Sequence, residues 1–155
     1  MKTIIKALAA ASFVIAAGAA YAVDMGTPQE AATLVKKAAA YLKATDRKKA
    51  LAEFNDPKGK FVDRDLYIFV LDLKGNVVAL GSDTVRKTVG MNLSDMRDVD
   101  GRYFVRNMLT MATTTGSGWV DFKFPNHLKN DAIEAKVNYI QKVDDLIIGC
   151  GAFKF

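Results

Sequence analysis

The stretch LYIFVLD, residues 66–72, decides the fold class, because it is apolar on both of the faces that a β-strand presents. A strand of this kind needs cover on both sides, which predicts an inner position in a sheet. The turn sequence Lys74-Gly75-Asn76 follows directly. It predicts a hairpin, so that VVAL at residues 77–80 returns as the next, antiparallel strand.

A helical pattern precedes this hairpin. Thr27, Pro28 and Glu30 have the spacing of a capping box with proline at the first helical position. Apolar residues then recur at helical spacing as far as Phe54. Asp46 interrupts the run and can cap a second helix over residues 46–54.

The residues after the hairpin predict one helix and three strands. We expect the helix at residues 100–115 and the strands at residues 119–124, 133–143 and 146–153. The order is then helix, two strands, helix, three strands, with three hairpin links. It predicts an α+β fold with a five-stranded antiparallel sheet. The long N-terminal helix covers one face of this sheet, and the helix at residues 100–115 with its loops covers the other.

The first 22 residues have the pattern of a secretory signal peptide. Lys2 and Lys6 precede an apolar run, and Ala20-Tyr21-Ala22 forms an A-x-A cleavage site. The run is short for a membrane anchor, which needs roughly 20 apolar residues, and no second run of spanning length follows. We therefore expect cleavage after Ala22, a single domain over residues 23–155, and a periplasmic or secreted protein without a membrane span.

Composition excludes several functional classes. The chain of 155 residues is 50% hydrophobic and 25% charged, which is typical of a globular domain rather than a disordered one. Its single cysteine and single histidine exclude an internal disulfide and a zinc site built from several cysteines or histidines. Without Lys2 and Lys6, the 22 basic and 17 acidic residues leave a charge of +3, which gives no argument for nucleic acid. No catalytic or nucleotide-binding motif occurs, so we expect no catalytic residue, metal or cofactor.

Several stretches of the mature chain, taken together and in order, resemble the single Cache domain of type 2, an extracytoplasmic PAS-like sensor family. These stretches are residues 50–56, 65–77, 90–93, 100–106, 116–122, 136–139 and 146–151. The resemblance implies the same five-stranded sheet with a long N-terminal helix. It also implies binding of a small organic acid such as acetate, propionate, pyruvate or lactate. Because the chain ends at Phe155, directly after the last predicted strand, we expect signalling to need a separate membrane receptor or sensor-kinase partner.

Lys136 and Tyr139 are the first candidates for a carboxylate site. Lys136 offers a positive charge and Tyr139 a neutral hydrogen-bond donor. Their odd spacing puts them on opposite faces of a regular strand, so both reach one ligand only across a bulge. From its residue type alone, Lys136 is interpreted as a solvated edge lysine, and the resemblance makes a role in ligand binding an equal alternative.

Aromatic residues complete the candidate site: Tyr67, Tyr103, Trp119, Phe122 and Phe124. Strand periodicity places Trp119 opposite Phe122 and Phe124, so one group lines a pocket or all three belong to the core. The resemblance implies Tyr and Trp where this chain has the two phenylalanines, which leaves Tyr67, Tyr103 and Asn138 as further donors. The sequence thus predicts a carboxylate pocket between the sheet and the helix at residues 100–115. The alternative is a PAS-like scaffold with a filled core that docks on a partner.

Overall fold

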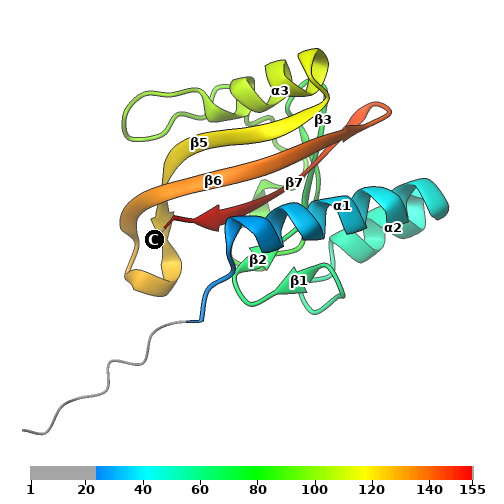
Figure 1. The fold of residues 1–155 in the computed structure, drawn as a ribbon, viewed down its shortest axis with the longest axis horizontal. Coiled ribbons are helices and arrows are strands. Elements are labelled where there is room, and N and C mark those ends of the chain that lie inside the picture. The colour runs from blue at the N-terminus through cyan, green and yellow to red at the C-terminus, as the bar shows by residue number, and fades with distance from the viewer. Residues whose placement is uncertain (1–23, 155) are drawn as a thin grey trace, which may run out of the picture.

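The structure of the protein is a computed structural model that describes residues 24–154, so the predicted signal peptide lies outside the described residues. Figure 1 shows a long helix lying across a curved sheet, with a second layer on the other side. In chain order the elements are α1 (Pro28–Ala44), α2 (Arg47–Phe54), β1 (Val62–Asp63), β2 (Leu66–Tyr67), β3 (Phe69–Asp72), β4 (Val77–Leu80), the 3-10 turn η1 (Arg86–Thr88), α3 (Phe104–Thr114), β5 (Ser117–Asn126), the 3-10 turn η2 (His127–Lys129), β6 (Ala132–Val143) and β7 (Leu146–Phe153).

The first two helices begin where their capping residues predict. The Thr27 hydroxyl accepts the N–H of Glu30, and the Glu30 carboxylate accepts the N–H of Thr27. Asp46 caps α2 by accepting the N–H of Lys49 at 3.1 Å. Each cap satisfies backbone donors that have no partner within the helix. The predicted capping box and second N-cap are therefore confirmed.

The main sheet has five antiparallel strands in the order β4-β3-β7-β6-β5. The predicted α+β class with its PAS-like sheet is confirmed. The predicted strand at residues 66–72 is divided at Ile68, because Leu66 and Tyr67 pair with β1 while residues 69–72 join β4 and β7. β3 therefore has the inner position that its apolar sequence predicts.

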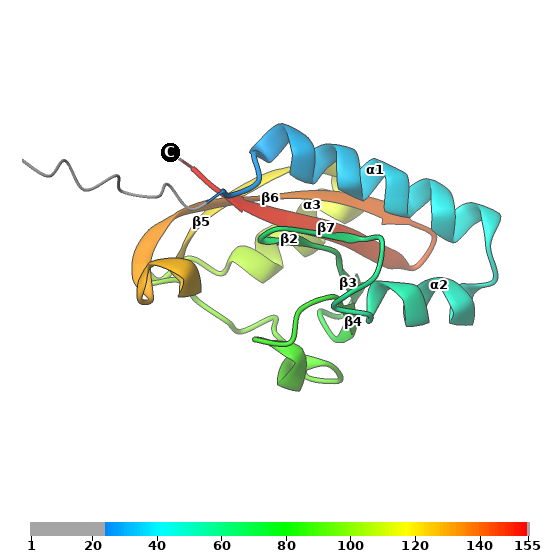
Figure 2. The same cartoon turned by 90° about the horizontal axis from the view of Figure 1, so that it is seen from below.

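Two separate cores lie on the two faces of the sheet. Val70 belongs to the cluster beneath α1, and the adjacent Leu71 belongs to the cluster that includes α3. Figure 2 shows α1 along one side of β6 and β7, with the loop between β4 and α3 on the far side. The alternating side chains of β3 thus contribute to both cores, which explains why LYIFVLD is apolar throughout.

The helix predicted at residues 100–115 begins later, at Phe104. Asp98 accepts the N–H groups of Asp100 and Arg102 at 3.0 and 2.9 Å, and Gly101 has a φ of 80°. This turn occupies the residues that would have formed the first turn of the predicted helix. Within residues 24–154, no helix has the length and apolar character needed to cross a bilayer.

Candidate ligand-binding site

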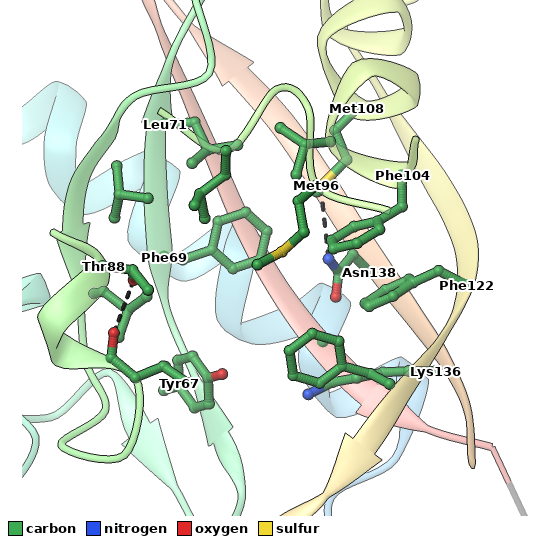
Figure 3. Close-up of a pocket in the computed structure, with 17 residues that line it drawn as sticks. Tyr67, Phe69, Leu71, Thr88, Met96, Phe104, Met108, Phe122, Lys136 and Asn138 are labelled. Atoms are coloured by element: carbon green, nitrogen blue, oxygen red, sulfur yellow. Dashed lines mark hydrogen bonds between the residues drawn. The ribbon is translucent and has the colours of Figure 1, made fainter. Parts of the chain in front are cut away.

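A cavity of about 120 Å³ lies between the sheet and α3 (Figure 3), and we name it the apolar chamber. Phe69 and Leu71 of β3 line one side, and Phe104 and Met108 of α3 line the other. The loop between β4 and α3 closes it with Val85, Thr88, Leu93 and Met96. One water molecule needs about 10–15 Å³ of cavity volume, so the chamber has room for a small organic molecule.

Aromatic rings form the wall beside α3. Phe104 stacks on Phe122 with ring centroids 4.4 Å apart and planes 9° from parallel. Phe124 meets both rings edge-on, at 6.3 and 5.8 Å. Edge-on and stacked contacts of this kind stabilise the rings against one another. The wall offers a ligand apolar contact and no hydrogen-bond donor.

Lys136 supplies the one cationic side chain among the residues that line this chamber. It lies on β6, only 8% of it is exposed, and it extends toward Tyr67 (Figure 3). Its Nζ lies 4.4 Å from the centre of the Phe153 ring and 5.4 Å from that of Phe124. Within residues 24–154 the ammonium makes no hydrogen bond and no ion pair. A largely buried ammonium without an acceptor from the protein favours an anion or another acceptor beside it.

The charge state of Lys136 reflects this burial. Loss of water around the ammonium lowers the pKa of Lys136 below its usual 10.5, and the charge of Asp65 offsets only part of that effect. Burial also raises the pKa of the Cys150 thiol to about 12, so the thiol is neutral at pH 7. A bound carboxylate would favour the charged lysine and supply the missing acceptor.

Two neutral groups lie beside Lys136. Burial raises the pKa of Tyr67 to about 12, so its hydroxyl keeps its proton and remains a donor. Asn138 is buried two residues along β6, and its amide donates to the Met108 sulfur at 3.6 Å. Sulfur is a weak acceptor, so this amide can exchange its partner for a ligand oxygen at little cost.

Two glycines of β7 make room for these side chains. A Cβ at Gly151 would overlap Asn138 Oδ1 and lie 2.7 Å from Lys136 Cε. A Cβ at Gly149 would overlap the Phe69 ring. Cys150, between them, points to the other face and belongs to the core beneath α1. Gly151 therefore lines the chamber itself, and Gly149 makes room for Phe69, which also lines it.

The structure brings together four of the seven residues that the sequence suggested: Tyr67, Phe122, Phe124 and Lys136 all line the chamber. The other three do not. β6 pairs with both neighbours without a register shift, so the bulge that would join Lys136 and Tyr139 is absent. Tyr139 instead packs on the α1 side of the sheet, edge-on to Trp119 at 4.9 Å.

Tyr103 also lies outside the chamber. It is the residue before α3, and the guanidinium groups of Arg97 and Arg106 each lie 4.2 Å from the centre of its ring. The expectation that Tyr103 faces the pocket assumed a helix that already includes residue 103. Because the turn at Asp98 delays the helix, Phe104 takes the cavity-facing position instead.

Sequence reasoning did not select Phe69, Thr88, Met96, Phe104 or Met108 for the site. Phe69 lies in an apolar run, and the helical period marks Phe104 and Met108 as core, so none of them carries a polar signal. Gly149-Cys150-Gly151 did carry a signal, because glycine inside a strand often marks a close approach of another group.

The sequence matches the family of single Cache domain 2 over residues 9–154. The chain belongs to this family. The match begins inside the predicted signal peptide, which lies outside the described residues. No curated protein matches the chain.

Solved structures similar to this Cache domain share its fold. A periplasmic sensor domain of a chemotaxis protein has a TM-score of 0.63 and 21% identity, over 82% of this chain and 90% of that one. A methyl-accepting chemotaxis protein from Vibrio parahaemolyticus RIMD 2210633 has a TM-score of 0.64 and 17% identity, over 81% of this chain and 86% of that one. A Cache chemosensory domain whose structure describes carboxylic acid recognition has a TM-score of 0.60 and 21% identity. The match covers 82% of this chain and 88% of that one.

Proposed function

We propose that this Cache domain is an extracytoplasmic sensory module that binds a short-chain monocarboxylate such as acetate, propionate, pyruvate or lactate. The observation that carries the proposal is Lys136, a buried ammonium without an acceptor at the end of an aromatic chamber. In the bound state the ligand carboxylate accepts hydrogen bonds from Lys136 and Tyr67. Its short tail lies against Phe104 and Phe122.

The alternative is a scaffold that docks on a partner through a filled PAS-like core. That interpretation requires side chains in the space that the chamber occupies. A cavity of about 120 Å³ beside Lys136 favours ligand binding instead. A separate membrane receptor or sensor kinase is the partner that such a binding module would report to, as the chemotaxis proteins of similar fold suggest.

Dicarboxylates are expected to bind more weakly than propionate. Phe122 and Phe124 offer no donor, so the second carboxylate of malate or succinate would be buried without a partner, at a cost of about 1–3 kcal/mol. Side-by-side calorimetric titrations of the mature protein with propionate, malate and succinate measure the difference. Tighter binding of malate would contradict the predicted apolar end of the site, and binding of none of these acids would refute the proposed function.

The mature protein is expected to begin at Val23 and to fractionate with soluble exported proteins. The reason is the A-x-A site at residues 20–22, which follows a short apolar run. N-terminal sequencing of the protein recovered from the periplasmic fraction tests this. Intact chains that begin at Met1 in the membrane pellet would contradict it.

A further inference from the structure

A second cavity, of about 270 Å³, adjoins the apolar chamber, and we name it the polar chamber. The two share Tyr67, Val85, Phe124 and Lys136 in their walls. The remaining lining of the polar chamber includes charged and hydroxyl side chains, among them Arg64, Asp65, Ser82 and Thr84. The Lys136 side chain therefore lies where an apolar and a polar compartment meet.

Asp65 is the unsatisfied group of the polar chamber. Its Oδ1 accepts the N–H of Gly26 at 2.6 Å, whereas its Oδ2 is buried and has no donor among the residues that the structure describes. Asp65 and Lys136 are not within ion-pair distance of each other, although the Asp65 charge acts on Lys136. A buried carboxylate oxygen without a donor is costly, as is a buried ammonium without an acceptor. The two chambers thus present one unmatched negative group and one unmatched positive group.

The other charged groups of the polar chamber already have partners. Arg64 pairs with Asp63 at 2.8 Å and with Glu30 at 2.9 Å. Asp83 faces Arg86, and His127 faces Asp131. Asp65 is therefore the acidic group best placed to receive a donor from a ligand.

A simple carboxylate would satisfy only half of this arrangement. It supplies an acceptor to Lys136 but brings a second negative charge close to Asp65, which is unfavourable in a poorly hydrated site. A molecule with an ammonium beside its carboxylate supplies a partner to each group and adds no net charge. Building on the function proposed above, we infer that the two chambers form one site for a small aliphatic α-amino acid. Its carboxylate faces Lys136, its ammonium faces Asp65, and its side chain enters the apolar chamber.

Alanine and propionate form a matched pair for the test, because propionate is alanine without its amino group. Calorimetric titration of the mature protein is expected to give at least tenfold tighter binding of L-alanine than of propionate. In Asp65→Asn the affinity for alanine should fall at least tenfold, while that for propionate stays unchanged or rises. Asparagine keeps an oxygen for the Gly26 N–H, so the variant retains the one hydrogen bond that Asp65 makes.

Asp121→Asn is the matched control, since Asp121 is an exposed acid of β5 that lines neither chamber. It should leave both affinities within twofold of the parent. Propionate binding as tightly as alanine in the parent overturns the inference and leaves the proposed function standing. A preference for alanine that survives in Asp65→Asn overturns the role of Asp65, even if that variant loses stability. Binding of neither compound to the parent overturns the inference and the proposed function together.

Discussion

Lys136→Met is expected to weaken propionate binding by about 2–5 kcal/mol, the range for removing one partner of a buried charge pair. This corresponds to a loss of about 30-fold to several-thousand-fold in affinity. Methionine keeps an apolar stem of similar length, so the cavity wall survives while its charge is lost. Calorimetric titration of parent and variant gives the comparison.

The same variant should raise the melting temperature at pH 7. In the free protein the Lys136 ammonium is buried without an acceptor, so its charged form destabilises the fold. Burial lowers the folded-state pKa of Lys136 below 10.5, so the unfolded chain binds more protons between those two values. The loss of stability caused by the buried charge is therefore complete below the folded-state pKa of Lys136. It disappears as the pH rises to 10.5. The stability gain of Lys136→Met should shrink over the same interval.

Lys142→Met is the control, because Lys142 lies on the same strand and is exposed. It should leave the affinity for propionate unchanged and shift the melting temperature by no more than about a degree. Unchanged propionate affinity in Lys136→Met would mean that Lys136 does not bind the ligand and would remove the basis of the proposed site.

Gly151→Ala is expected to lower propionate affinity by tenfold or more. The new Cβ would overlap Asn138 Oδ1 and lie 2.7 Å from Lys136 Cε, so both side chains must leave their positions in the chamber. The lysine end is flexible and moves readily, whereas the backbone of β7 does not. Overpacking of this kind costs about 1–3 kcal/mol of stability, which the fold can survive. Titration and thermal unfolding measure the two effects separately.

Cys150→Ala provides the matched control for Gly151→Ala. Cys150 is the adjacent residue of β7, but its side chain belongs to the core beneath α1. Its truncation should lower the stability and leave propionate affinity unchanged. If Gly151→Ala binds propionate as the parent does, the close packing of Lys136 and Asn138 over β7 does not determine the site.

Local patterns account for much of the fold. The capping box at Thr27 and Glu30 and the apolar strand at residues 66–72 predict their elements correctly, because the interactions involved connect near neighbours in sequence. Strand periodicity also separates Lys136 from Tyr139 and Trp119 from Phe122, as the structure has them. The predicted start of α3 is wrong, because a side chain of the preceding turn, Asp98, takes over the backbone N–H groups that a first helical turn would leave free.

Which strand residues line the chamber was decided by the tertiary structure alone. Periodicity separates Trp119 from Phe122 and Phe124 within one strand, but it does not say which of the two groups faces α3. The pairing of Phe122 with Lys136 and of Trp119 with Tyr139 depends on the register of β5 against β6. Asp65 reaches the vicinity of Lys136 only because the sheet brings distant parts of the chain together. By itself, the sequence determined the elements, the separation of faces within each strand and the residue types available for a carboxylate. The site itself depends on long-range packing, which no local pattern encodes.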